Sequence, residues 1–126
     1  MRLGLLAIVS AITALPHVAG AQNVDKTLDV IDFLVDGPDL IGKRVTVTGC
    51  SFANADSTSV KCRAPNYTGT LYIDSKSMER ESLRRALKTC AGYEQHAHCR
   101  GSATGIVTSG IFGGPRLGDA TIEWAE

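Results

Sequence analysis

The stretch GTLYIDSKSMERESLRRALKTC, residues 69–90, changes its hydrophobic period halfway along, and this change decides the fold. In its first part Leu71 and Ile73 alternate with polar residues, which is the period of a half-buried strand. In its second part Leu83 and Leu87 recur at the spacing of one helix face. The sequence therefore predicts a strand followed directly by a helix near the middle of the chain.

The predicted helix has start and stop signals of its own. Ser77 is the expected N-cap, and Gly92 lies just beyond Cys90, the last residue of the inward-facing row. Basic side chains share the opposite face, which a solvated helix surface explains without any ligand.

Two strands are predicted before this stretch. In DLIGKRVTVTGC, residues 39–50, valines alternate with polar residues, and Gly49 is a candidate bulge. Residues 51–59 have turn composition throughout, and a short second strand follows at residues 60–63.

Two strands are also predicted after the helix. A glycine-rich strand is expected from about residue 96 to 107, and TIEW, residues 121–124, is expected to bury Ile122 and Trp124. The order strand, strand, strand, helix, strand, strand is that of the OB-fold, a five-stranded partly open barrel. The alternative is a small α+β sandwich, which would leave strand edges that the sequence does little to protect.

An amphipathic helix is predicted ahead of the barrel, over residues 24–36. Four apolar residues recur at helical spacing on one side, and four aspartates repeat on another. These residues are Val24, Leu28, Ile31 and Val35, and Asp25, Asp29, Asp32 and Asp36. The acidic stripe is either a solvated face or the surface for a protein partner. We thus expect an N-terminal helix within residues 22–37 and an OB-fold domain over residues 38–126.

Residues 1–21 have the features of a secretory signal peptide. Arg2 precedes an apolar run over residues 3–15, and the small-residue pattern Ala19-Gly20-Ala21 follows. The apolar run is too short for a membrane anchor, and no later segment is apolar enough to span a bilayer, so no stable membrane insertion is expected. A periplasmic or secreted location follows. Cleavage would remove one of the thirteen basic residues and none of the thirteen acidic ones, leaving a net charge of −1.

Four cysteines in an exported chain are expected to form two disulfides, for which three pairings exist. We favour Cys50 with Cys62 and Cys90 with Cys99, because each pair flanks a short connection between neighbouring elements. The stretch TCAGYEQHAHCRG, residues 89–101, leaves two other hypotheses open, a metal site and a reactive thiol. Alternation along a strand would point Cys99 away from the two nearby histidines, and no C-x2-C pair occurs, so neither hypothesis is favoured.

The chain resembles small exported bacterial OB-fold proteins similar to the anticodon-binding-like OB family. The resemblance rests on DLIGKRVTVTGC, GTLYIDSK and the ending GSATGIVTSG…ATIEW, and it covers about residues 38–124. It implies a binding module whose ligand lies across the second and third strands, between the first-to-second and fourth-to-fifth loops. On this chain those positions hold six candidate ligand-binding residues, with Phe52 also in the first of these loops: Lys61, Arg63, Tyr67, Tyr72, Phe112 and Arg116.

Basic side chains beside aromatic ones suit single-stranded nucleic acid or another anionic ligand, since cations track phosphates and rings stack on bases. The alternative for both aromatic residues is a purely structural role. Tyr72 would then pack across strands, and Phe112 would cover the barrel mouth. No paired carboxylates, catalytic triad order or metal box stands in the sequence, so we expect no enzyme, cofactor or metal. The alternative function is a periplasmic protein-interaction or envelope-stress module that uses the acidic N-terminal helix.

Overall fold

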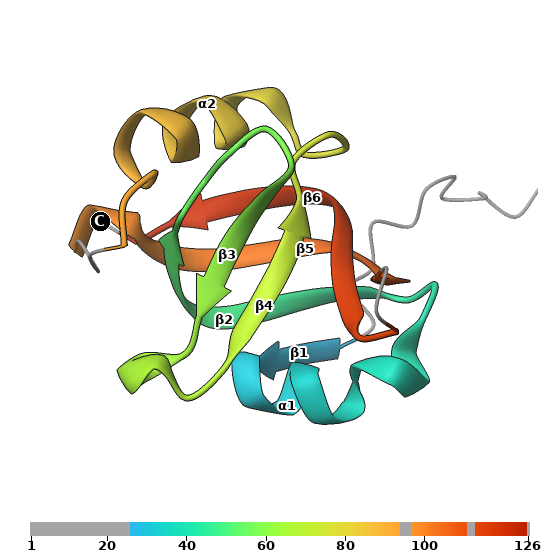
Figure 1. The fold of residues 1–126 in the computed structure, drawn as a ribbon. Coiled ribbons are helices and arrows are strands. Elements are labelled where there is room, and N and C mark those ends of the chain that lie inside the picture. Colours follow the sequence, from blue (N-terminus) through green and yellow to red (C-terminus); the bar gives the residue numbers. More distant parts are fainter. Residues whose placement is uncertain (1–25, 94–96, 111–112, 126) are drawn as a thin grey trace, which may run out of the picture.

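The computed structural model describes residues 26–93, 97–110 and 113–125 of the chain. The predicted signal peptide therefore lies outside the described residues. Six strands and two α-helices follow one another along the chain (Figure 1) in this order: β1 Lys26–Asp29, α1 Val30–Asp36, β2 Arg44–Ala53, β3 Ser59–Arg63, β4 Thr70–Asp74, α2 Arg80–Thr89, β5 Arg100–Ser109 and β6 Pro115–Trp124. Short 3-10 turns lie at Gly37–Leu40, Pro65–Tyr67 and Ala97–Cys99. None of the helices in these ranges is long and apolar enough to cross a membrane.

Five of the strands close into a barrel. The sheet order is β1-β2-β3-β4-β6-β5, and β5 pairs back onto β2 to close it. Closure depends on β2, which bends where its register with β5 shifts between Val47 and Cys50. Gly49 lies in that shift with φ of 72°, a conformation that suits glycine and confirms the predicted bulge. The last seam is parallel and short, with Tyr72 and Ile73 of β4 opposite Arg116 and Leu117 of β6.

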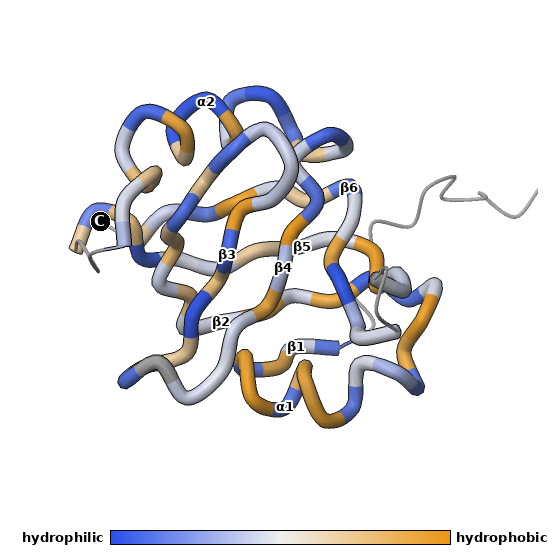
Figure 2. Tube along the Cα trace, in the orientation of Figure 1, coloured by the Kyte–Doolittle hydropathy of each residue, from blue (hydrophilic) through white to orange (hydrophobic). Residues whose placement is uncertain are grey.

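The barrel interior holds the core. In β4 Leu71 and Ile73 are fully buried and Tyr72 is 48% exposed, as the alternation of the sequence predicts. Figure 1 shows α2 at one end of the barrel and α1 at the other, and hydrophobic segments run through the strands and α1 in Figure 2. Apolar side chains from both helices and all the strands thus form one cluster.

The N-terminal prediction is partly wrong. Residues 26–29 form a strand, β1, which pairs in parallel with β2, and the helix begins only at Val30. The reason is that Asp29 acts as N-cap, its Oδ1 accepting from the Asp32 amide at 2.8 Å. The helix also turns a different face inward from the one predicted. It buries Val30 and Phe33, and leaves Ile31 41% and Val35 70% exposed.

Helix α2 also differs from the prediction at its start. Glu79, not Ser77, is the N-cap, because its carboxylate accepts from the amides of Glu81 and Ser82 at 2.8 Å each. The small residues Ser82 and Ala86 are the ones that α2 buries. Leu87, which was predicted to share the inward face, is 40% exposed. The Ser82 hydroxyl accepts from the backbone amide of Ile122 at 2.9 Å, which fixes α2 on β6.

Three strand boundaries were predicted wrongly. Strand β2 continues to Ala53, which shortens the expected first loop. Strand β5 begins at Arg100 and not near residue 96, because Ala97–Cys99 form a 3-10 turn before it. Strand β6 begins at Pro115 and not at residue 121, because its pairing with β5 extends back to Pro115.

The structure confirms the predicted disulfides. Cys50 is bonded to Cys62, and Cys90 is bonded to Cys99. The first bond joins the neighbouring strands β2 and β3 inside the barrel. The second ties the end of α2 to the residue that precedes β5, and all four cysteines are buried.

Candidate functional site

A row of three side chains crosses the outer face of strands β3, β4 and β6. Lys61 is the register partner of Tyr72, and Tyr72 is the register partner of Arg116. Since alternate residues of a strand point to opposite faces and the neighbours of Tyr72 are in the core, all three side chains are on the outside. We call Lys61, Tyr72 and Arg116 the barrel-face row. It places an exposed aromatic ring between two cations.

The ammonium group of Lys61 has three neighbours on this face. It donates to the Asn54 carbonyl at 3.2 Å and lies 3.6 Å from Asp56 Oδ2. It also lies 6.0 Å from the centre of the Tyr72 ring, at the limit of a cation–π contact. Its charge is therefore held close to the ring, and Asp56 neutralises part of it.

Asp56 organises the loop between β2 and β3. Its Oδ1 accepts from the amides of Thr58 and Ser59 at 2.8 and 2.9 Å, and the Ser75 hydroxyl donates to its carbonyl at 2.7 Å. The Ser59 and Thr58 amides, with a smaller contribution from Lys61, hold the pKa of this carboxyl below its usual value. The loop is thus fixed next to the row by a carboxylate that stays ionised.

Arg116 is differently placed from Lys61. No ion pair joins its guanidinium to any residue of the described ranges, whose two ion pairs are Lys61 with Asp56 and Arg84 with Glu81. Its Nε is buried and without a hydrogen bond in the same part of the chain. A Cβ built on Gly110 would lie 3.0 Å from Arg116 Cγ, so the stem packs against the β5–β6 loop. The cation is anchored by its stem and keeps its charge available.

A pocket of about 370 Å³ opens beside Tyr72 and Arg116, within the size range of small-molecule sites. It lies where the loop before β3 meets the loop between β5 and β6. The residues that line it are Thr58, Ser59, Tyr72, Gly110, Gly114, Pro115 and Arg116. The two loops that the resemblance implied therefore meet over the barrel-face row.

The other predicted site residues fall outside the row. Arg63 lies two residues along β3 from Lys61, and with the Asn54 amide oxygen turned toward it, its Nη2 donates to that oxygen at 2.6 Å. The side chain of Tyr67 and all of Phe112 lie outside the described part of the structure. Phe52 was expected in a loop, but it is a fully buried core residue of β2.

Sequence reasoning missed the polar and proline residues that complete the pocket. Thr58 and Ser59 belong to a segment with turn composition, and Pro115 lies before the strand predicted at residues 121–124. The Asp56-Ser57-Thr58-Ser59 run does carry a usable signal, since an aspartate that accepts from amides two and three residues on is typical of a tight turn. Pro115 has no such signal, because it lines the pocket only through the pairing of β6.

A second, larger hollow of about 670 Å³ lies where β2, β5, β6 and the turn at Pro65–Tyr67 meet. Its lining includes Gly49, Gly101, Arg100 and Ser51, whose buried hydroxyl makes no hydrogen bond within the described ranges.

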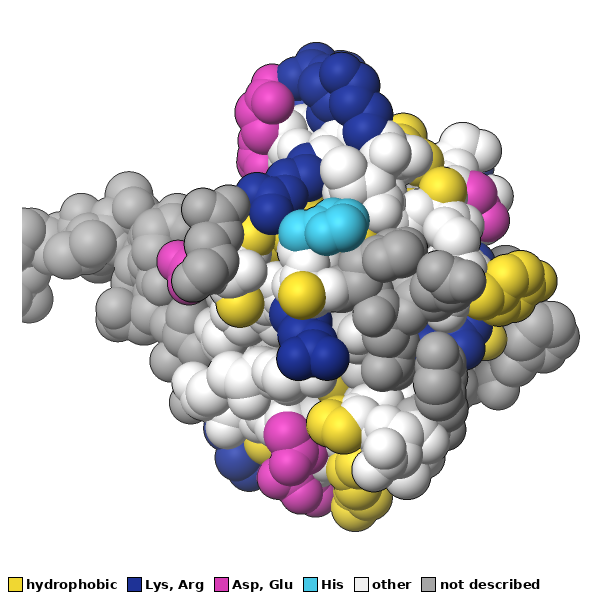
Figure 3. Space-filling view, turned by 90° about the vertical axis from the view of Figure 1, so that its left-hand side faces the viewer, with side chains coloured by type: hydrophobic (Ala, Val, Ile, Leu, Met, Phe, Trp, Pro, Cys, Tyr) yellow, Lys and Arg dark blue, Asp and Glu magenta, His cyan; other side chains and the backbone are white. Residues whose placement is uncertain are grey.

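On the face of the molecule in Figure 3, basic side chains are separated by neutral ones and interspersed with acidic ones. That face shows no continuous basic stripe among its described side chains.

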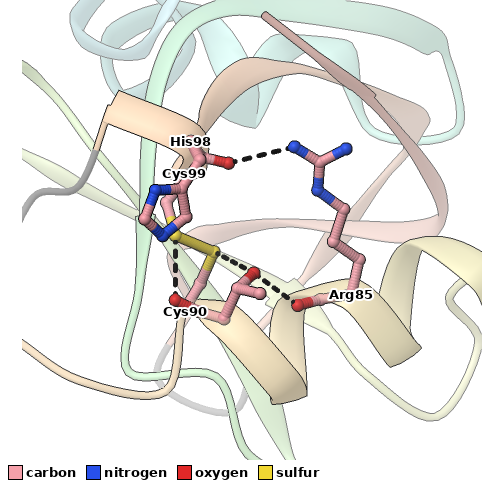
Figure 4. Close-up of a disulfide and its surroundings, with 5 residues drawn as sticks. Arg85, Cys90, His98 and Cys99 are labelled. Carbon is pink, nitrogen blue, oxygen red and sulfur yellow. Dashed lines mark hydrogen bonds between the residues drawn. A yellow bond between two sulfur atoms is a disulfide. The ribbon is translucent and has the colours of Figure 1, made fainter. Parts of the chain in front are cut away.

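Residues 89–101, which suggested a metal or thiol site, instead hold the end of α2 next to the start of β5 through a disulfide. Figure 4 shows the Cys90–Cys99 bond beside Arg85, whose Nη2 donates to the His98 carbonyl at 3.3 Å. The Arg85 guanidinium also stacks 4.4 Å from the centre of the Trp124 ring. Both cysteines are oxidised, and no three His, Cys, Asp or Glu side chains gather as metal ligands in the described residues. His96 lies outside those residues.

The strand order, the bulged first barrel strand and the helix between the third and fourth barrel strands define an OB-fold. No protein-family model matches the chain. No curated protein matches it either. Among solved structures, it is similar to an asparaginyl-tRNA synthetase from Pyrococcus horikoshii, with a TM-score of 0.44 and 19% identity over 71% of this chain. The match spans 21% of the synthetase, about a fifth of its length, and at this level it assigns neither family nor ligand.

Proposed function

We propose that this protein is a non-enzymatic, exported binding module that holds an anionic, extended ligand such as single-stranded nucleic acid across the barrel face. The observation that carries the proposal is the barrel-face row. Lys61 and Arg116 flank the exposed ring of Tyr72 on neighbouring strands. A ring between two cations can stack on a base while the cations meet the phosphates on either side.

The pocket beside the row adds to this support. Its lining combines the apolar Pro115 and the Tyr72 ring with the hydroxyl residues Thr58 and Ser59 and the basic Arg116. An apolar slot with a few polar groups and one cation suits a flat ring that carries a phosphate. Gly114 has no atom within 4 Å of the place a Cβ would take, so a ligand can approach the backbone closely there.

The proposal includes that the protein catalyses no reaction. A general base near neutral pH needs a pKa close to the working pH. Asp56, the carboxylate of this face that contacts Lys61, has a pKa below its usual value; its Oδ1 accepts from two backbone amides and its Oδ2 lies near Lys61. It holds the β2–β3 loop in place and is poorly suited to proton transfer.

Export is supported by the cysteines. Both disulfides are buried, and such bonds persist in oxidising compartments. With the leader-like sequence of residues 1–21, they support a periplasmic or secreted site of action. Nucleic acid is one anionic polymer there, and the ligand chemistry is shared by others, such as inorganic polyphosphate.

The test is a fluorescence anisotropy titration of a labelled single-stranded oligonucleotide with the oxidised protein, repeated with polyphosphate as competitor. Base stacking contributes about 1–3 kcal/mol for each base, so Tyr72→Ala should weaken oligonucleotide binding roughly 5- to 150-fold. The same variant should leave the inhibition constant of polyphosphate nearly unchanged. A flat titration of the wild-type protein would refute the proposal. Equal loss for both polymers would refute the stacking role of Tyr72 and leave a simple anion site.

A further inference from the structure

Helix α1 presents an apolar row and an acidic row side by side to solvent. Ile31 and Val35 are 41% and 70% exposed, and they are four positions apart in the helix, so they are neighbours on one face. Asp32 and Asp36 each follow one residue later and form the adjacent row. No basic residue occurs between residues 29 and 40. We call these four side chains the acidic α1 face.

Helix α2 presents the same arrangement with the opposite charge. Leu83 and Leu87 form an apolar row, in which Leu83 is partly buried against the core and Leu87 is 40% exposed. Arg84 and Lys88 follow one residue later and form a basic row, in which Arg84 also pairs with Glu81 on its own helix. Lys88 makes no ion pair with a described residue. These four side chains are the basic α2 face.

The order of the rows determines how the two faces can meet. In both helices the charged row follows the apolar row by one residue, and charged residues are four apart in both. If the two helices pack antiparallel, the apolar rows meet each other and the acidic row meets the basic row. Parallel packing would instead set leucine against aspartate and isoleucine against arginine or lysine. The faces are therefore complementary in one direction only.

We propose that the acidic α1 face docks on the basic α2 face of a second copy of this chain, with the two helices antiparallel. The helices lie at opposite ends of the barrel (Figure 1), so each copy would offer one face to each neighbour. Such a contact is heterologous, so it joins copies head to tail into open chains or closed rings. Helices of 7 and 10 residues bury little area, so the association is weak and depends on concentration and salt.

The first experiment is sedimentation equilibrium of the oxidised protein over a wide concentration range, in 50 mM and in 500 mM NaCl. We expect the weight-average mass to rise above the 13.3 kDa of the full chain, or the smaller value if the leader has been removed, as concentration increases in low salt. High salt should lower the mass at each concentration. A monomer at every concentration in low salt overturns the proposal.

A charge exchange identifies the surfaces. One variant carries Asp32→Lys and Asp36→Lys, and the other carries Arg84→Glu and Lys88→Glu. Each variant alone has two faces of the same sign and should stay monomeric, whereas an equimolar mixture has complementary faces and should associate again. Circular dichroism and thermal melting of each variant confirm folding. Association of either variant alone to the wild-type extent, or a mixture of folded variants that stays monomeric, contradicts the proposal.

Discussion

Replacing Arg116 with glutamine should change the salt dependence of oligonucleotide binding by a predictable amount. The variant removes one charge from the barrel-face row and keeps a polar side chain. The cations on this face are Lys61, Arg63 and Arg116, and Lys61 is partly neutralised by Asp56. Two to three effective phosphate contacts follow. Each contributes about −0.7 to the slope of log affinity against log salt for a single strand.

The wild-type slope should therefore lie between about −1.4 and about −2.1. Raising NaCl from about 50 to about 200 mM would lower the affinity roughly 7- to 18-fold, and the Arg116→Gln variant would lose only roughly 3- to 7-fold over the same range. The assay is anisotropy titration at four salt concentrations. Arg100→Gln is the matched control, because Arg100 is an exposed arginine that lines the other hollow.

Two results would refute this reasoning. If Arg116→Gln binds with the wild-type slope, Arg116 makes no phosphate contact and the barrel-face row is not the site. If Arg100→Gln lowers the slope as much as Arg116→Gln does, the charge effect is diffuse and does not belong to the row.

Three further predictions concern stability. Replacing Cys50 and Cys62 by alanine opens a buried disulfide with a sequence separation of 12, and loop entropy predicts a loss of about 3 kcal/mol in urea unfolding; a loss below about 1 kcal/mol would contradict this. Gly105→Ala should cost about 1–3 kcal/mol, because a Cβ there would lie 2.5 Å from a carbonyl of β6, whereas Gly92→Ala meets no atom within 4 Å and should leave the melting temperature nearly unchanged. The carboxyl of Glu79 has a pKa below its usual 4.5, through the hydroxyl and amides that it binds at the start of α2, so it stabilises the fold above that pH and loses this effect as the pH falls. The Glu79→Gln variant should therefore melt below wild type at pH 7 and approach it below pH 4, and an equal difference at both pH values would count against this assignment.

The elements of the barrel were largely predictable from local pattern. The alternation around Leu71 and Ile73 gave their burial correctly, and the helical spacing after Ser77 located α2 to within three residues at its start. The disulfides were predictable because each joins cysteines only 12 or 9 residues apart, at the ends of neighbouring elements. Local period and short separation suffice for such features.

The N-terminal segment shows where local pattern fails. Apolar residues at helical spacing predicted one long helix, yet the pairing of Lys26–Asp29 with β2 extends that part of the chain into a strand. Once the strand has formed, Asp29 becomes the N-cap and Phe33 turns into the core. Tertiary pairing therefore overrode the local period, because the ladder and the burial of Leu28 and Phe33 outweigh a helix of that length.

By itself, then, the sequence determined the order of strands and helix in the barrel and which side of a strand such as β4 is apolar, and it favoured the cysteine pairing that the structure shows. Only the tertiary structure decided which side chains from different strands are neighbours. Tyr72 and Arg116 are 44 positions apart in the sequence, and the parallel seam between β4 and β6 makes them partners. The physical reason is that a hydrophobic period depends on adjacent residues, whereas register depends on pairing between distant segments, and a shift by one residue would turn the row to the other face.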